Sequence, residues 1–351
     1  MKNPIFTGLW GNLHIQGIAV DTKKEYIYYS FTTKLIKATL DGEIVGSVDG
    51  LMGHLGCIAF NENDGKVYGS LEYKNDQIGR GILSALGSSA EIRDAFYIAI
   101  FDVDKIDRLD MSAERDGIVR CVYLKEVVDD YSGEGSDISG QAVPHRYGCS
   151  GIDGTTFAPL PGERDEKRYL YVAYGVYSDV NRSDNDHQVL LCYDTSDWND
   201  IAKPLNQYSM HTDGPSAPLR KFFVYTGNTT YGVQNLEYDK HTNSLFMAVY
   251  RGVKPKFPNY DLFVADMSEP CAMRELTGLG ESGYMIPLAK LGSEKNGIYG
   301  FDFPYGSTGL YSYGDGRWLI SQNRVQNGEQ CSDIFAYEWN DERGFEPSLK
   351  N

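Results

Sequence analysis

Apolar and polar positions alternate along this chain in short, strand-length runs, and the same arrangement recurs five times. The first copy contains four such runs, at Ile15–Asp21, Tyr26–Thr32, Lys34–Leu40 and Glu43–Val48. Polar turns separate the runs, which is typical of β-hairpins. The later copies begin near Leu55, Gly151, Gly232 and Thr308.

One four-stranded sheet cannot bury both of its faces, whereas several sheets packed radially share a continuous core. The repetition therefore predicts an all-β fold, a β-propeller of five four-stranded blades in a single domain over residues 1–351. Blades usually take about 40 residues, so the wider spacing of the later copies indicates long insertions. A β-sandwich, or six or seven blades with one hidden in an insertion, are the alternatives.

The last copy lacks a complete fourth strand, and the chain starts with an unassigned apolar segment, Pro4–Trp10. We expect this N-terminal strand to complete the last blade and close the ring.

The amino-acid composition limits which classes of molecule this protein is expected to bind. The chain has 38 Gly, 26 Tyr and 15 Phe, which suits β structure, and a formal net charge of -16. That charge argues against nucleic acid as a partner, because such binding uses a basic surface. No apolar run is long enough for a membrane span and no signal peptide is recognisable, so a cytoplasmic location is expected. The six cysteines form no CxxC pair, and we expect buried free thiols.

Long connections follow the second strand of most copies, at Lys74–Ala95, Val176–His187, Gly252–Asn259 and Arg324–Ser332. The connections between first and second strands are short. Because successive strands are antiparallel, the long connections share one face with the starts of the innermost strands. Function on a rigid scaffold gathers where loops are long, so this face is the predicted functional face.

Polar residues mark the strand ends on that face. The starts of the innermost strands carry His14, Gln16, His54, Arg146, Tyr147 and Gln234. The ends of the second strands carry Glu72, Tyr174, Tyr250 and Arg251. Arginine binds carboxylates and tyrosine offers an apolar face with a polar tip, so the mixture suits a small saccharide or a sugar acid. Alternatively, His14 and His54 have only a structural role and make capping hydrogen bonds where the chain enters a blade.

Three chemistries are compatible with these residues. A divalent metal, manganese, calcium or zinc, is the first, with His14, His54, His187 and Gln234 as its ligands. The second is β-elimination from a uronic acid, in which a histidine or tyrosine is the base and Arg146 or Arg251 neutralises the carboxylate.

Glycoside hydrolysis by two carboxyl groups is the third chemistry. Glu72 is the leading acid, and its partner would come from Asp179, Asp184 or Asp186. The carboxylate-rich run that holds these three residues also fits a solvated or calcium-binding loop.

The repeat pattern resembles the β-propeller superfamily over essentially the whole chain. Five-bladed glycoside hydrolases and fructosyltransferases are similar in blade number, but they carry acidic residues where this chain has His14, His54 and Gln234. Cytoplasmic oligogalacturonate lyases are similar in using histidines and a glutamine around manganese. Gluconolactonase-type lactonases also look related, but their Glu, Asn and Asp metal set is not recognisable here.

The sequence thus predicts a carbohydrate-active enzyme, a lyase or a glycoside hydrolase, with His14, His54, Glu72 and Arg146 as catalytic residues. The expected substrate-binding residues are Gln16, Tyr147, Tyr174, Tyr250 and Arg251. The alternative is a non-catalytic propeller that serves as a platform for a protein or another ligand.

Overall fold

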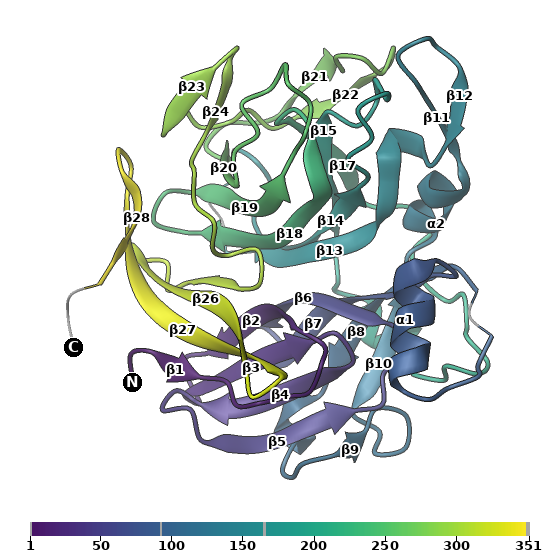
Figure 1. Ribbon diagram of the computed structural model, residues 1–351, viewed down its shortest axis with the longest axis vertical. Helices are drawn as coiled ribbons and strands as arrows, with labels where there is room; N and C mark the ends of the chain where they lie inside the picture. Colours follow the sequence, from purple (N-terminus) through teal and green to yellow (C-terminus); the bar gives the residue numbers. More distant parts are fainter. Residues whose placement is uncertain (1, 92, 164–165, 349–351) are drawn as a thin grey trace.

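Five β-sheets surround a central channel in the computed structural model, which describes residues 2–91, 93–163 and 166–348 (Figure 1). Each sheet contributes one innermost strand. These strands contact one another in a closed cycle, in the order β2, β6, β13, β18, β25 and back to β2. The predicted five-bladed β-propeller is confirmed.

The first two blades are antiparallel meanders extended at their outer edges. Blade 1 consists of β2 (Ile15–Asp21), β3 (Tyr26–Phe31), β4 (Lys34–Thr39), β5 (Ile44–Asp49) and the parallel outer strand β9 (Met111–Ser112). Blade 2 consists of β6 (His54–Asn61), β7 (Lys66–Tyr73), β8 (Ala95–Phe101), β10 (Val119–Tyr123) and β16 (Lys203–Pro204). Their strands follow the first two predicted copies closely.

The next two blades carry larger additions. Blade 3 consists of β13 (Cys149–Ala158), β14 (Tyr169–Val176), β15 (His187–Tyr193), β17 (Arg220–Tyr225), β22 (Ser282–Met285) and β21 (Ala272–Glu275). Blade 4 consists of β18 (Thr229–Asp239), β19 (Ser244–Arg251) and β20 (Leu262–Asp266). Leu262 also bridges to Phe301, just after the hairpin of β23 (Ser293–Lys295) and β24 (Ile298–Gly300).

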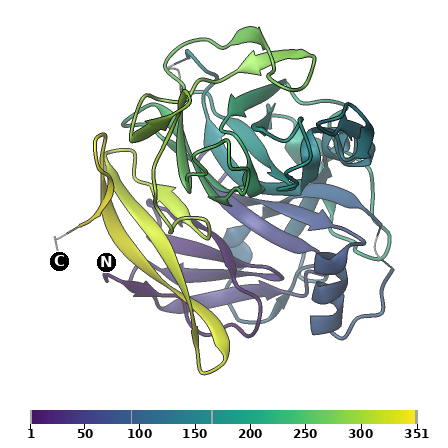
Figure 2. The same ribbon diagram turned by 45° about the horizontal axis from the view of Figure 1, so that its top comes forward.

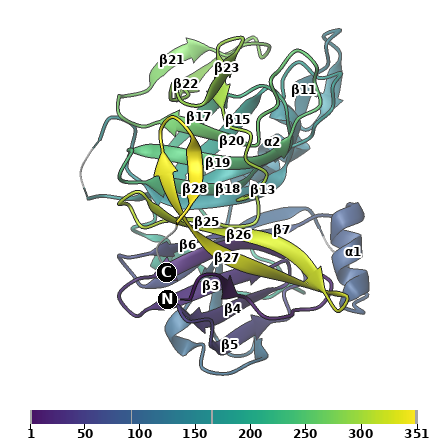
Figure 3. The same cartoon turned by 60° about the vertical axis from the view of Figure 1, so that its left-hand side comes forward.

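The last blade combines both ends of the described chain. Its strands are β25 (Leu310–Ser312), β26 (Arg317–Gln326), β27 (Glu329–Asn340), β28 (Gly344–Pro347) and the N-terminal β1 (Ile5–Phe6). Ile5 pairs with Ile334 of β27, and the Thr7 amide donates to the Ser332 carbonyl at 3.0 Å. Figure 3 shows this blade, in yellow, lying against the purple strands of blade 1. The N-terminal segment therefore pairs with the last blade, as its sequence suggested.

The short helices lie in the insertions between strands. They are α1 (Gln77–Ala85), η1 (Val103–Lys105), α2 (Lys125–Ser132), η2 (Arg146–Gly148) and α3 (Trp198–Ile201), with a hairpin of β11 (Glu134–Ser136) and β12 (Ala142–Pro144). Helix α1 begins where the Asp76 carboxylate accepts a hydrogen bond from the Gly79 amide. Figure 2 shows α1 at the edge of the propeller, beside the blue strands of blade 2.

Apolar side chains fill the spaces between neighbouring blades. Between blades 4 and 5, for example, the ring of Phe246 lies 4.5 Å from that of Trp318, and both side chains are buried. Strands buried on both faces explain why many of them read as continuous apolar runs rather than strict alternations. The six cysteines are free thiols, and all but Cys271 are buried, as expected. Within the described residues, no helix is long and apolar enough to span a membrane.

Candidate functional site

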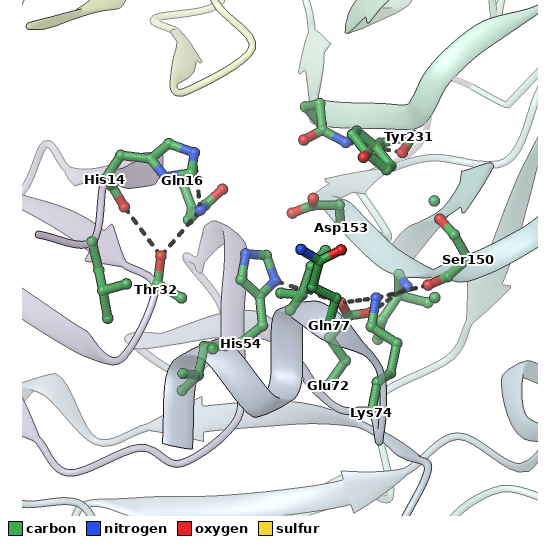
Figure 4. A pocket seen from close by; sticks show the side chains of 18 of the residues that line it. His14, Gln16, Thr32, His54, Glu72, Lys74, Gln77, Ser150, Asp153 and Tyr231 are labelled. Atoms are coloured by element: carbon green, nitrogen blue, oxygen red, sulfur yellow. Dashed lines mark hydrogen bonds and ion pairs between the residues drawn. The ribbon is translucent and has the colours of Figure 1, made fainter. Parts of the chain in front are cut away.

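A pocket of about 480 Å³ opens at the mouth of the channel on the predicted functional face (Figure 4). Blades 1 to 4 and helix α1 line it. The polar lining residues are His14, Gln16, Thr32, His54, Glu72, Lys74, Gln77, Ser150, Asp153, Tyr231, Gln234 and Tyr250. The insertion after β7 thus forms one wall of the pocket, as its length suggested.

Bulges near the starts of the innermost strands shape the mouth. The register shifts between Ile15 and Gly17 in β2, and β6, β13 and β18 have similar irregularities near their starts. A bulge bends a strand and redirects its side chains. The shifts coincide with the positions where these strands supply pocket residues, such as Gln16 and Gln234.

Glu72 lies in the pocket wall, directly opposite His54 in the β6–β7 ladder. Its Oε1 atom is 2.6 Å from Lys74 Nζ, and its Oε2 atom accepts a hydrogen bond from the Ile152 amide at 3.1 Å. Burial raises the pKa of Glu72, and the Lys74 ammonium and this amide oppose the rise. Both partners donate, so the contacts stabilise Glu72 as a carboxylate.

Lys74 is the buried counter-ion of Glu72. Its ammonium also donates to the Ser150 carbonyl at 2.8 Å. Burial alone would lower the pKa of Lys74, but the neighbouring Glu72 carboxylate raises it above the ordinary lysine value. The pair therefore brings a fixed carboxylate and a neutralised cation into the pocket.

Asp153 is the second carboxyl group of the pocket, on β13 of the next blade, and only 8 % of its surface is exposed. Its Oδ1 atom accepts one hydrogen bond, from the Cys57 amide at 3.3 Å. Burial raises the pKa of Asp153 well above its ordinary value, and the charge of Glu72 adds to the rise. Asp153 therefore holds its proton more tightly than an exposed aspartic acid does, and it stands next to Glu72, which two donors stabilise.

Two glycines make room for these carboxyl groups. A Cβ atom at Gly56 would lie 2.1 Å from Asp153 Oδ1, and one at Gly151 would lie 2.0 Å from Glu72 Oε2. Gly151 also has a φ of 131°, which side-chain-bearing residues rarely adopt. The backbone of the two innermost strands is thus fitted to the two acids.

The two histidines of the pocket are neutral. Burial lowers the pKa of His14, and it lowers that of His54 to about 3. His14 Nε2 lies 3.3 Å from Gln16 Nε2, and Gln16 in turn donates to the Thr32 hydroxyl. His54 Nδ1 is buried without a hydrogen bond and lies 3.7 Å from Glu72 Oε1. These imidazoles can exchange hydrogen bonds with a ligand but do not supply positive charge.

The remaining walls are aromatic and apolar. Tyr231 is half exposed and adopts a φ of 62°, and its carbonyl accepts a hydrogen bond from Gln234 Nε2. Burial raises the pKa of Tyr250, and the nearby Asp153 carboxyl group adds to the rise. Figure 4 places Asp153 between Tyr231 and the side chains of blade 2. Tyr231 lines the pocket and is accessible to a ligand.

Six of the residues predicted from the sequence line this pocket together: His14, Gln16, His54, Glu72, Gln234 and Tyr250. The others do not line it. The Arg146 guanidinium pairs with Glu281 at 2.6 Å, and the Arg251 guanidinium pairs with Asp261 and Asp302. Both predicted arginines are therefore bound to carboxylates elsewhere on the surface.

The two other tyrosines belong to the packing between strands. Tyr147 is buried with its ring 5.4 Å from that of Phe223, and Tyr174 is buried with its hydroxyl donating to Asp130. Neighbouring residues of a strand face opposite sides of the sheet. The side chain of Tyr174 lies on the side away from the pocket, where it packs between strands.

His187 also lies apart from the pocket, at the start of β15, where its ring packs near Phe223 and Tyr225. The four metal ligands suggested by the sequence, His14, His54, His187 and Gln234, are therefore not gathered at one point. In the part of the chain that the structure describes, no three His, Cys, Asp or Glu side chains are grouped to hold a metal.

The carboxylates proposed as partners of Glu72 have other contacts. Asp184 pairs with Arg182 at 2.8 Å, and Asp186 is the counter-ion of two lysines. Asp179 accepts a hydrogen bond from the Asn181 amide in its own loop. The structure places Asp153 beside Glu72 instead.

Sequence reasoning missed Asp153 and Lys74. Asp153 stands between Ile152 and Gly154 in an innermost strand, and an acid inside an apolar run flanked by glycines was the available signal. Lys74 follows Glu72 by two positions, just beyond the end of β7, and its ammonium contacts the Glu72 carboxylate.

No protein-family model matches this chain, and no curated protein matches it. Solved structures match it at low identity. A GH43 β1,3-galactosidase with galactodeoxynojirimycin is 12 % identical, with a TM-score of 0.43, over 99 % of this chain and 98 % of that one. The PQQ domain of pyranose dehydrogenase from Coprinopsis cinerea is 14 % identical, with a TM-score of 0.36, over 91 % and 81 %. The Dos1 propeller is 9 % identical, with a TM-score of 0.33, over 96 % and 82 %.

Proposed function

We propose that this propeller is a glycoside hydrolase that cleaves a small, neutral saccharide at the channel mouth. The observation that carries the proposal is the pair of carboxyl groups, Glu72 and Asp153, which stand in one pocket in different environments. Lys74 and the Ile152 amide hold Glu72, whereas burial and the Glu72 charge raise the pKa of Asp153. Glycosidases use such a pair, one acid and one carboxylate.

Asp153 is the general acid in this proposal. It donates its proton to the glycosidic oxygen as the bond from that oxygen to the anomeric carbon breaks. The Glu72 carboxylate stabilises the positive charge that develops on the sugar ring. Water adds to the anomeric carbon and its released proton restores the acid, so that the products are two sugars or a sugar and an alcohol.

The charge of the pocket favours a neutral substrate over a uronic acid. Lys74 is neutralised by Glu72, and both lining histidines are uncharged at neutral pH. Arg146 and Arg251, which a β-elimination would need near the substrate carboxylate, lie outside the pocket with their own carboxylate partners. A lyase reaction on a uronic acid is therefore the weaker proposal.

Hydrogen-bonding groups around the two acids suit a polyhydroxylated ligand. Gln16, Gln234 and the two neutral imidazoles can each bond a hydroxyl. Tyr231 offers an accessible aromatic ring against which the apolar face of a sugar could pack. A concave pocket with perturbed acids also favours catalysis over the alternative of a docking platform.

The test is a hydrolysis screen with alkyl glycosides and disaccharides, whose leaving groups need a general acid, of neutral sugars and of uronic acids. We compare the wild type with Glu72→Gln and Asp153→Asn, and we use Glu43→Gln, at an exposed turn before β5, as the control. We expect turnover of at least one neutral glycoside, a loss of about 10²-fold or more in both pocket variants, and no loss in the control.

Thermal melting of each variant separates loss of chemistry from loss of folding. Equal activity in the wild type and in folded Glu72→Gln would overturn the proposal. Turnover only of uronic acid substrates, with release of an unsaturated product, would replace it by the lyase reaction.

A further inference from the structure

A second cavity, of about 470 Å³, lies at the opposite mouth of the channel. All five blades contribute to it through the far ends of their innermost strands and the turns that follow. Its lining combines carboxyl groups, cations and aromatic rings. The hydrolase proposal assigns no role to this cavity.

Glu237 of β18 is the carboxyl group at the centre of this mouth. Its Oε1 atom accepts a hydrogen bond from the Ser312 amide at 2.9 Å, and its Oε2 atom accepts one from the Thr156 hydroxyl at 3.2 Å. The two donors come from blades 5 and 3, on either side of β18. Glu237 is therefore held in place by neutral groups, and its other acceptor positions are left for a ligand.

Aromatic rings surround this carboxyl group. Phe157, Tyr238, Tyr311 and Tyr313 all line the cavity. The Tyr311 and Tyr313 rings meet edge to face, with centroids 5.1 Å apart. Rings in such positions attract cations through their π faces, most strongly where water is excluded.

Once Glu237 is ionised, carboxylates outnumber cations in the lining of this mouth. Glu62, Glu166 and Glu237 line the cavity, against the two cations Arg168 and Lys240. The Arg168 guanidinium lies over the Tyr238 ring, 5.5 Å from its centroid. Asp239 adds a negative charge close to Glu237, and Asp21 adds one close to Tyr311. This field favours a cationic ligand over an anionic one.

We propose that this second cavity binds an organic ammonium ion, with Glu237 as its counter-ion and the Tyr311 ring as its π face. The site is separate from the proposed hydrolase site, since the two open at opposite ends of the channel. The proposal therefore stands or falls independently of the function of the first pocket.

Proton linkage makes the proposal testable. Burial raises the pKa of Glu237 to about 8, and the nearby Asp239 charge contributes to the rise. A bound cation favours the ionised carboxylate, so binding must release a proton below this pH. Affinity should then rise by about tenfold per pH unit below pH 8 and level off above it.

The experiment is isothermal titration calorimetry of the full chain with tetramethylammonium between pH 6 and 9. This probe carries no titratable proton, so any pH dependence belongs to the protein. We expect saturable binding at one site that strengthens toward pH 8, with weaker or no binding to Glu237→Gln. Glu72→Gln, at the opposite mouth, should bind tetramethylammonium like the wild type.

A second pair of variants distinguishes the loss of an aromatic ring from a loss of folding. Tyr311→Phe keeps the ring and should bind like the wild type, whereas Tyr311→Leu should bind at least several-fold more weakly. Melting curves without ligand confirm that each variant is folded. Absence of saturable binding at any pH, or equal binding by folded Glu237→Gln, would overturn the proposal.

Discussion

Glu72 and Lys74 form a buried ion pair in the wall of the proposed active site, with Oε1 and Nζ 2.6 Å apart. Each side chain exposes only 6 % of its surface. Ionised groups are costly to bury unless they are paired. The pair explains how a carboxylate persists inside the pocket beside Asp153, a second buried carboxyl group.

Removing the ammonium should therefore destabilise the protein. Lys74→Met leaves a buried carboxylate without its counter-ion, which typically costs about 3–5 kcal/mol. We expect a lower midpoint in urea unfolding. The double variant Lys74→Met, Glu72→Gln should recover much of the loss, and a failure to recover would show that Lys74 acts independently of Glu72.

Replacing Asp153 by Asn should stabilise the protein while it slows hydrolysis of substrates with poor leaving groups. The pKa of Asp153 is raised in the folded state, so the folded protein holds a proton that the unfolded chain releases. Stability therefore falls as the pH rises from the unfolded pKa, near 4, through the folded pKa, by about 1.4 kcal/mol for each unit of elevation.

Asn cannot titrate, so Asp153→Asn should melt at a higher temperature than the wild type above neutral pH and lose this advantage in acid. Melting temperatures of both proteins between pH 4 and 9 measure the difference. A lower melting temperature for Asp153→Asn throughout that range would contradict the raised pKa of Asp153.

The fit of the backbone to the acids predicts the effect of an added methyl group. Gly151→Ala would place a Cβ atom against Glu72 Oε2, which Lys74 and the Ile152 amide hold in place. We expect a marked fall in melting temperature. Gly81→Ala, on helix α1 with open space around its Cα, should instead raise stability by about 1 kcal/mol. Equal effects of the two changes would contradict the fit.

The pairing of the N-terminal strand with the last blade predicts that Ile5 matters for stability. Ile5 is fully buried against residues of blades 1 and 5, whereas the neighbouring Phe6 is 39 % exposed. Ile5→Ala should cost about 2–5 kcal/mol, as typical core truncations do. Phe6→Ala, its matched control, should cost clearly less in the same denaturant titration.

The fold was more predictable than the site. Repeated runs such as Tyr26–Thr32 revealed the blades because strand length and turn chemistry are local properties. Local pattern also identified Glu72 and His54, since both stand at strand ends on the functional face. It could not show that Arg146 pairs with Glu281, because that contact joins residues far apart in sequence. The sequence did not identify Asp153 for a related reason: its role depends on residues of a neighbouring blade.

The leaving-group dependence of Asp153→Asn tests the central claim most directly. A general acid is needed for a poor leaving group but not for a good one, such as dinitrophenolate. We predict that Asp153→Asn cleaves a dinitrophenyl glycoside at close to the wild-type kcat but loses about 10²-fold or more with a methyl or sugar aglycone. An equal loss with both substrates would contradict the assignment of Asp153 as the acid of a glycoside hydrolase.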